Sequence, residues 1–413
     1  MNFLTNFPDK DELLQWWQNN KTERNLKVNC HIHTPFSFSA FTDIRQPFEM
    51  ALKEDIKVLG INDFFVADGY EAFYENAVSN RIFPEFNIEF IGLLAKEQED
   101  GIKVNDPNNP GRTYFSGKGL NYPFRVSPSY LQRLEQVINE SQKQVRLMLA
   151  KTNELLENIR APFLFEFEDL RKEFAKKLVR ERHIAKAIRV RLQEYFDNDD
   201  EKTAFLKRLF NGKEQHADIN NNTLLEEEIR TNLLKAGGTA YIPEDKKAFL
   251  PVAEVITIII DAGGIPCYPV LLDNKNGNYT DFEQDHIKLA ERLIELGVGC
   301  IELIPGRNKS ENLTRFVNYM EKRGFVILFG TEHNTPQLMP LTVKASDKHL
   351  DSYLEKVAYE GACIVAAHQY SKSRDKEGFI DNKGLAKTNH KKEFVKLGKA
   401  VIEKYLSDKF IKM

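Results

Sequence analysis

The last third of the chain alternates short, almost continuous apolar runs with amphipathic segments. The apolar runs cover residues 265–270, 299–304 and 325–329. The segments between them, 285–296 and 311–322, repeat apolar residues with helical spacing and stop close to a glycine. Strands that are apolar along their whole length are buried on both faces, as they are in a parallel sheet or barrel. The alternation therefore predicts an α/β fold built from βα repeats.

The first hundred residues show the same alternation. Helical patterns at 46–54 and 69–80 each precede a strand pattern, at 58–61 and 87–94. At 413 residues the chain exceeds one ordinary domain, although α/β barrels often form a single long unit. The two ends of the chain are therefore expected to build one sheet together.

The middle of the chain, residues 127–241, differs from both ends. It carries long, charged helical patterns with few strand signals. Without it the chain keeps roughly 300 residues, close to the ~250 of a (β/α) barrel. We therefore predict a barrel formed by residues 1–126 and 242–413, and a large helical insertion at 127–241. The insertion is expected to be either a stabilising or dimerising helical hairpin, which would make a homo-oligomer, or a lid over the active site.

The composition argues against several classes of partner. A net charge of −3 gives no bulk attraction to nucleic acid or anionic lipid, and no run of 18 apolar residues could span a membrane. The four cysteines, Cys30, Cys267, Cys300 and Cys363, are far apart and form no Cys-x-x-Cys pair. They are typical of reduced core residues, so we expect a cytoplasmic protein without a membrane or nucleic-acid partner.

Two histidines stand two residues apart at the end of a predicted strand. Apolar and polar residues alternate over 26–33, and the strand pattern breaks at Thr34-Pro35. Because side chains of a strand alternate between faces, His31 and His33 leave the same face and can converge on one metal ion. Ligands of parallel α/β folds bind at this end of the strands.

Acidic residues recur at or near the ends of other predicted strands. Asp63 follows one strand, Glu89 and Glu302 lie inside two others, and Glu332 and His333 follow the last one. A carboxylate inside an apolar strand is costly to bury without a partner. A metal ion shared with the histidines would supply that partner. A salt bridge or hydrogen bond at a strand end is the alternative.

The order and spacing of these residues resemble the PHP superfamily of polymerase-associated and histidinol-phosphatase-like domains. The resemblance covers roughly residues 25–100 and 250–340. It is based on His31-x-His33-Thr34, Ile61-Asn62-Asp63, Glu89 and Gly330-Thr331-Glu332-His333. It implies a distorted (β/α)7 TIM-like barrel whose metal ions lie at the carboxyl ends of the strands. It also implies metal-dependent phosphoester hydrolysis of a small phosphorylated substrate, with one to three zinc, manganese or iron ions.

Residue by residue, the resemblance and the strand ends together give a set of expected metal ligands. The set is His31, His33, Asp63, Glu89, Glu302, Glu332 and His333. Among them we expect Asp63, Glu332 and His333 to take part in catalysis, since a metal-activated water needs a proton acceptor nearby.

The chain departs from the family pattern at several positions. Phe64 replaces a histidine, Cys267-Tyr268-Pro269 replaces Ala-His-Pro, and residues 38–40 lack the next ligand. Two alternatives therefore stay open. The barrel could bind a ligand or partner with an altered metal site, or it could be a metal-dependent hydrolase of amides or lactones.

Cations near the strand ends are candidates for binding a phosphate. Arg112 ends a turn-rich stretch at 105–112, and Lys118 lies between two glycines just behind it. Arg307 and Asn334 follow two later strands. The alternative for the 105–119 stretch is an ordered surface loop. His368, on the apolar face of a predicted helix, is expected to be a core histidine bonded to a backbone carbonyl.

Overall fold

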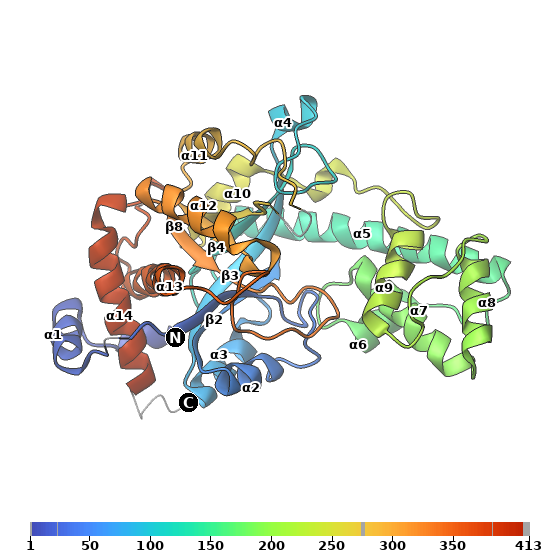
Figure 1. Cartoon of the computed structure of the whole chain (residues 1–413), viewed down its shortest axis with the longest axis horizontal. Helices are drawn as coiled ribbons and strands as arrows, with labels where there is room; N and C mark the ends of the chain where they lie inside the picture. Colours follow the sequence, from blue (N-terminus) through green and yellow to red (C-terminus); the bar gives the residue numbers. More distant parts are fainter. Residues whose placement is uncertain (1, 23, 274–276, 382, 408–413) are drawn as a thin grey trace.

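Seven strands form one sheet that curls into a nearly closed barrel (Figure 1). The computed structural model describes residues 2–22, 24–273, 277–381 and 383–407. In sheet order the strands are β1 (Lys27–Ile32), β2 (Ile56–Phe64), β3 (Phe83–Leu93), β4 (Arg112–Lys118), β6 (Ile265–Val270), β7 (Cys300–Leu303) and β8 (Val326–Phe329). A short strand β5 (Leu250–Pro251) pairs with β3 beside this path. The predicted α/β barrel is confirmed.

The two ends of the sheet meet just beyond β1 and β8. The Thr331 and Glu332 amides donate to the His31 carbonyl at 3.1 and 3.0 Å. Gly330 permits this approach, because a Cβ there would lie 2.3 Å from the Cβ of His31. The closure brings residues 331–333 next to the predicted histidine pair.

One strand differs from the sequence-based expectation. Residues 112–118 form β4, which runs antiparallel to both β3 and β6, and not the phosphate-binding loop that the nearby glycines suggested. The strand buries alternate residues such as Thr113 and Phe115. β-branched and aromatic residues favour a strand, and here they outweigh the turn tendency of Gly117.

Helices surround the barrel, and one long helix covers the seam. They are α1 (Lys10–Asn20), α2 (Gln46–Lys53), α3 (Tyr70–Asn80), α4 (Ala95–Glu99), α10 (Val252–Asp261), α11 (His286–Glu295), α12 (Ser310–Lys322), α13 (Ser352–Lys372) and α14 (Lys391–Ser407). Helix α13 contacts both β8 and β1 and is buried over most of its length. α14 packs tightly on α13 at Gly398, where a Cβ would meet the Cys363 carbonyl at 1.8 Å.

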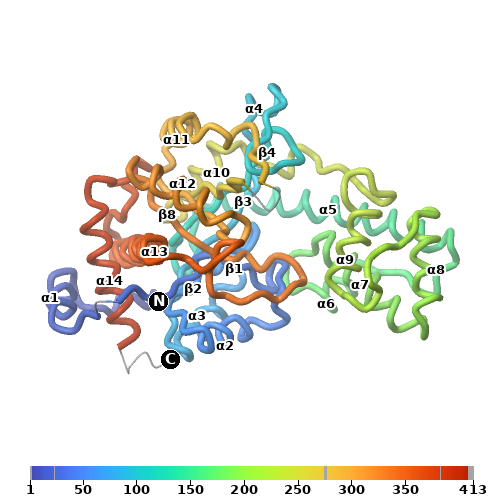
Figure 2. Tube along the Cα trace, viewed as in Figure 1, coloured from blue at the N-terminus to red at the C-terminus, as the bar shows by residue number. Residues whose placement is uncertain are grey.

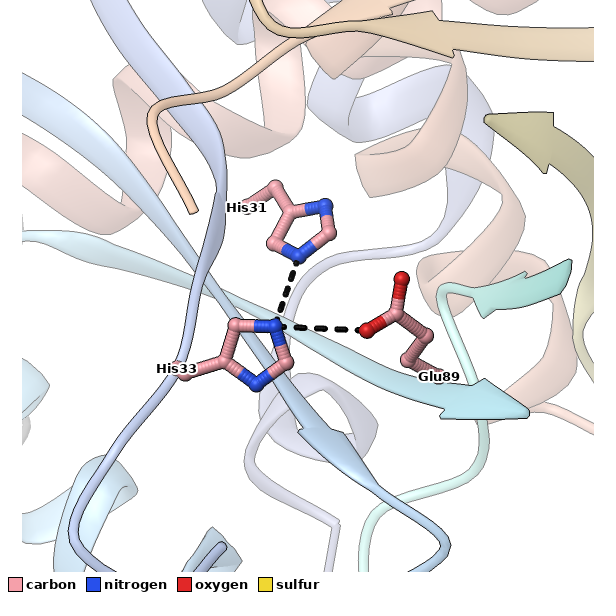
Figure 3. Close-up of side chains that lie close together, drawn as sticks. All are labelled: His31, His33 and Glu89. Carbon is pink, nitrogen blue, oxygen red and sulfur yellow. Dashed lines mark hydrogen bonds and ion pairs between the residues drawn. The ribbon is translucent and has the colours of Figure 1, made fainter. Parts of the chain in front are cut away.

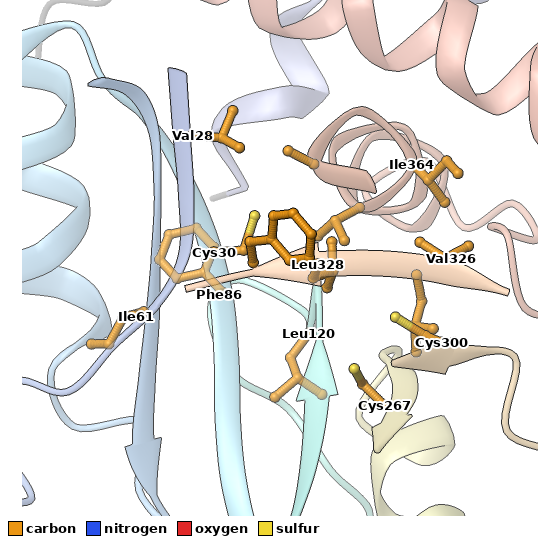
Figure 4. Packing of buried hydrophobic residues seen from close by; sticks show 14 of the residues in the cluster. Val28, Cys30, Ile61, Phe86, Leu120, Cys267, Cys300, Val326, Leu328 and Ile364 are labelled. Carbon is orange, nitrogen blue, oxygen red and sulfur yellow. The ribbon is translucent and has the colours of Figure 1, made fainter. Parts of the chain in front are cut away.

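The core of the barrel lies between the sheet and α13 (Figure 4). Cys30, Cys267, Cys300 and Cys363 are buried and free, as predicted for core cysteines. His368 bonds the Gly263 carbonyl at 2.6 Å, which confirms the predicted core histidine. Among the helices of the described residues, none has the length and apolar character needed to cross a membrane.

Residues 127–241 form helices that extend to one side of the barrel (Figures 1 and 2). They are α5 (Pro128–Asn158), α6 (Phe167–Phe174), α7 (Glu181–Tyr195), α8 (Asp199–Leu209), α9 (Asn222–Ile229) and a π-helical turn (Arg230–Leu234). Residues 175–180 separate α6 from α7, so the helical pattern of this region is divided into several shorter helices after α5. These helices have their own apolar cluster, although Leu134 and Val137 of α5 belong to the barrel core.

Candidate metal centre

Two histidines and one glutamate bring three possible ligand atoms together at one end of the barrel (Figure 3). His31 lies on β1 and His33 follows directly after Ile32, so the extended chain points both imidazoles to the same side. Glu89 reaches them from β3. His33 Nε2 is 3.3 Å from His31 Nε2 and 3.3 Å from Glu89 Oε2, and all three residues are buried.

The spacing of these atoms matches the ligand shell of a divalent ion. Ligands about 2.0–2.1 Å from a tetrahedral metal ion are ~3.3 Å from one another. That is the distance from His33 Nε2 to each of the other two atoms. Two imidazoles and one carboxylate are also a ligand set of catalytic zinc sites, in which the fourth position stays open to water or substrate. The three residues therefore fit one ion, and zinc, manganese and iron all accept such ligands.

Glu302 on β7 orients His31 from the opposite side of the ring. Its Oε2 lies 2.9 Å from His31 Nδ1. A carboxylate on the far nitrogen of a ligating histidine fixes the tautomer and leaves Nε2 free for the metal. The Asn62 amide nitrogen lies 3.0 Å from the same Nε2, a contact that a bound ion would replace. Glu302 is thus placed to support a ligand, although the sequence had suggested it as a ligand itself.

A buried lysine balances the charge of Glu302. The Lys118 Nζ lies 2.6 Å from Glu302 Oε2, and Ser116 donates to Oε1 at 2.5 Å. Burial is the largest single effect on both Lys118 and Glu302 and works against their ionisation, but it is outweighed by their mutual attraction and hydrogen bond together with smaller contributions such as that of His31 on Glu302. The pKa of Glu302 therefore lies below its usual value and the pKa of Lys118 above its usual value.

The candidate ligands themselves have displaced pKa values. Burial lowers the pKa of His33 to about 4, so its ring is neutral at pH 7 and has a lone pair for a metal. Burial raises the pKa of Glu89 to about 8, with a smaller opposing effect from His31. A cation between the three atoms would stabilise the ionised form of Glu89.

Asp63, a predicted ligand, lies outside this group of three. Its Oδ1 accepts the Thr34 amide at 2.7 Å and the Ser37 hydroxyl at 2.5 Å, and its Oδ2 accepts the Thr34 hydroxyl at 2.5 Å. Both oxygens are therefore engaged by the loop that follows β1, and burial raises the pKa of Asp63. The contacts place Asp63 as an anchor of the loop that contains His33, and its role as a ligand stays a prediction.

Glu332 and His333 both have positive φ values, 62° and 56°, and their side chains diverge. Glu332 lines the cavity described below and pairs with Arg307. His333 instead lies 2.8 Å from both Thr331 Oγ1 and the Met339 carbonyl, and its ring stacks on Phe41. His333 is thus bound to its own loop, so of the two residues only Glu332 lies where a substrate could reach it.

Three of the four predicted phosphate-binding residues line the cavity, although two of them, Arg307 and Arg112, are paired with carboxylates. Arg307 and Asn334 line the cavity near the three candidate ligands. Arg112 also lines it but pairs with Asp106, at 2.7 Å, and with Glu244. Lys118 is 0% exposed and is bound to Glu302, so it cannot contact a substrate directly.

A cavity of about 760 Å³ lies between the barrel and the helical insertion. His31 and Glu89 line it from the barrel. From the insertion it is lined by α5, through Gln144 and Met148, and by residues 180–182 and 230–236. The insertion therefore forms one wall of the cavity at the carboxyl ends of the strands, and its action as a lid stays a prediction.

Sequence analysis did not identify the residues that the insertion contributes. Arg180, Arg182 and Arg230 lie in segments of mixed charge that look like ordinary solvated helix faces. They are separated from His31 by about 150 to 200 residues, and no local pattern sets them apart. Only the packing of the insertion on the barrel places them at the cavity.

Comparison with known proteins finds similar solved structures but no matching sequence. No known family matches the chain, and no curated protein sequence does. One similar structure is a protein from Bifidobacterium adolescentis assigned as a metal-dependent phosphoesterase, with a TM-score of 0.49 and 16% identity over 78% of this chain and 94% of that chain. Another is an amidohydrolase from Chromobacterium violaceum, solved with sulfate and no metal, with a TM-score of 0.47 and 14% identity over 76% of this chain and 90% of that chain.

Proposed function

We propose that this protein is a metal-dependent hydrolase that binds one divalent ion through His31, His33 and Glu89. The observation that carries the proposal is the convergence of three buried ligand atoms within 4.8 Å of one another, two of the three pairs at 3.3 Å, beside a cavity of about 760 Å³. The support that Glu302 gives to His31 is typical of a site built for a metal. The resemblance of the sequence motifs to the PHP superfamily agrees with this chemistry.

The substrate that we propose is a small phosphoester. A divalent ion at this site would polarise a phosphoryl oxygen and acidify a bound water. Arg307 lines the same cavity and supplies a guanidinium that can bind the phosphoryl oxygens. Glu332 is the candidate for proton transfer because it lines the cavity. Burial opposes its ionisation, but Arg307, His31 and His33 together lower its pKa, so the carboxylate is ionised and can accept a proton.

We propose one ion where up to three were expected. The oxygens of Asp63 are engaged by Thr34 and Ser37, and His333 is bound to Thr331 and Met339. Glu302 is engaged by Lys118, Ser116 and His31. A second ion would need several of these contacts to break.

Elemental analysis after purification with added zinc, manganese or iron tests the metal site. We expect about one equivalent of metal in the wild type and a loss of that metal in a His31→Ala/His33→Ala variant. A His349→Ala/His390→Ala variant is the matched control, since both of these histidines are exposed. Metal-free wild-type protein, or equal metal content in all three proteins, would overturn the proposal and favour a barrel that only binds a ligand.

Activity measurements test the reaction separately. The metal-loaded wild type should hydrolyse a phosphomonoester or a phosphodiester such as a nitrophenyl ester, and the His31→Ala/His33→Ala variant should not. If a metal-loaded protein left every phosphoester intact but opened amides or lactones, the phosphoester assignment would be wrong while the metal site would stand.

A further inference from the structure

The two walls of the cavity have opposite charge. The described residues that line it from the insertion include Arg180, Arg182, Arg230 and Lys235, and one carboxylate, Glu181. The barrel wall has an excess of carboxylates, with Glu89, Glu302, Glu332, Asp106 and Glu244 against Arg112 and Arg307. A divalent ion among the ligands would offset the acidic wall. Glu181 and Glu227, which pair with Arg230 and Lys235, offset only part of the charge of the basic wall. The excess positive charge of the insertion wall is therefore available to an anion.

Two aromatic residues of the barrel fix the positions of two of these arginines. The Arg180 guanidinium lies 4.8 Å from the centre of the Phe64 ring, and the Arg182 guanidinium lies 5.2 Å from the centre of the Phe38 ring. Such cation–π contacts orient a guanidinium without using its N–H donors. These contacts thus position both guanidinium groups without using their N–H donors.

The hydrogen-bond partners of these arginines are incomplete. Among the described residues, Arg182 Nη1 and Arg230 Nε are buried atoms without a hydrogen-bond partner. Arg180 and Arg182 reach Glu181 only at 3.7 and 3.8 Å, while Arg230 donates to Glu181 at 2.9 Å and to Glu227 at 2.5 Å. Buried donors of a charged group are costly to leave unpaired, so their positions at a cavity indicate a ligand that pairs with them.

The basic wall lies close to the candidate metal ligands. Phe64 stacks on His33 with a centre-to-centre distance of 4.9 Å, and Arg180 lies on Phe64. The guanidinium carbon of Arg180 is therefore no more than about 10 Å from the centre of the His33 ring, which is two successive stacking distances. Helix α7 also begins at this wall, and its amino end adds positive potential.

We propose that Arg180, Arg182 and Arg230 form a subsite for a second anionic group of the substrate, distinct from the ester that is hydrolysed. The substrate class is a small molecule with a phosphoester at the metal and a further phosphate, or a carboxylate, several ångströms away. The inference that this ligand is a substrate rests on the proposed function. The anion subsite itself does not, because its arginines lie on the insertion.

Binding of inorganic pyrophosphate to metal-free protein tests the subsite without catalysis. An Arg180→Gln/Arg182→Gln variant should bind pyrophosphate roughly tenfold or more weakly than the wild type in titration calorimetry, since each charged hydrogen bond contributes about that factor. An Arg146→Gln/Arg171→Gln variant is the matched control. It removes the same charge from the insertion, and Arg146 also stacks on an aromatic ring, Phe167. Its affinity should stay within about twofold of the wild type.

The same titration separates this inference from the proposed function. The His31→Ala/His33→Ala variant should still bind pyrophosphate, because the arginines are untouched, even if it contains no metal. Citrate in place of pyrophosphate shows whether carboxylates are accepted as well as phosphates. If the double arginine variant fails to fold, Arg182→Gln alone replaces it. Equal pyrophosphate affinity in the arginine variants and the wild type, or no binding by the wild type, would overturn the subsite.

Discussion

The buried pair of Lys118 and Glu302 allows a quantitative test of how the barrel tolerates charge below its candidate metal site. Lys118 is 0% exposed and Glu302 is 1% exposed, and their charged atoms are 2.6 Å apart. Replacing Lys118 by Met keeps a long, unbranched side chain but leaves the Glu302 carboxylate without its counter-charge. We expect Lys118→Met to destabilise the protein far more than the loss of a surface lysine would.

The expected magnitude follows from the distance between the charges. At an effective dielectric constant of about 20, two unit charges 2.6 Å apart attract by roughly 6 kcal/mol. Both groups lose solvation on burial, which offsets part of that attraction. Removing one partner of such a pair costs about 3–5 kcal/mol, because the remaining charge stays buried. Lys118→Met and Glu302→Gln should each cost this much.

A double-mutant cycle separates the pair from its surroundings. In Lys118→Met/Glu302→Gln neither charge remains, so the double variant should be less destabilised than the sum of the single variants by several kcal/mol. Urea unfolding of metal-free protein, followed by tryptophan fluorescence, measures these differences. Both tryptophans, Trp16 and Trp17, lie on α1, which packs on α14, so the signal reports on the barrel.

Lys57→Met is the matched control, since Lys57 pairs with Asp55 at the surface and should lose less than about 1 kcal/mol. The reasoning would be refuted if the single costs added to within about 0.5 kcal/mol in the double variant. It would also fail if Lys118→Met were no more damaging than Lys57→Met. Either result would mean that water or another group neutralises Glu302.

Two further variants test the assigned roles of single residues. Asp63→Asn should lower the free energy of unfolding in urea by about 1–3 kcal/mol, because it weakens the hydrogen bonds to Thr34 and Ser37. If Asp63 is a loop anchor, the metal content of the purified variant should be unchanged. Loss of metal would instead make Asp63 a ligand. Burial, with a smaller contribution from Lys372, lowers the pKa of His368 to about 4 against the opposing effect of the Gly263 carbonyl. The unfolded chain therefore binds more protons, and stability falls as the pH drops below about 6.5. The stability of His368→Gln relative to the wild type, measured by urea unfolding, should therefore be about 2–3 kcal/mol more favourable at pH 4.5 than at pH 7. A stability difference between the two proteins that does not change with pH would contradict this assignment.

Local periodicity was sufficient for much of the fold and for part of the site. The apolar run 265–270 is a strand with the predicted bounds, since a continuous apolar run of that length fits a strand buried on both faces. His31 and His33 lie on one side because an extended chain alternates its side chains. Both results depend only on residues that are neighbours in the sequence.

Contacts between distant segments decided the roles of the charged residues. The pattern around Lys118 indicated a phosphate loop, but the pairing of β4 with β3 and β6 turned it into a buried strand beside Glu302. Asp63 has the position of a ligand in its motif, yet hydroxyl groups of the loop after β1 engage its oxygens. The side chains that pack next to a charged residue determine its hydrogen-bond and ion-pair partners, and the local sequence does not specify which side chains those are.

By itself, the sequence determined an α/β barrel with a paired-histidine strand end, because backbone geometry links residue spacing directly to side-chain direction. The tertiary structure alone decided which of the expected ligands converge, that Glu302 supports His31, and that arginines of the insertion face the candidate ligands across one cavity. Those relations depend on how strands and helices far apart in the chain pack against one another. Once they are packed, the cost of burying a charge decides which partner each charged residue takes, and local sequence patterns do not specify that partner.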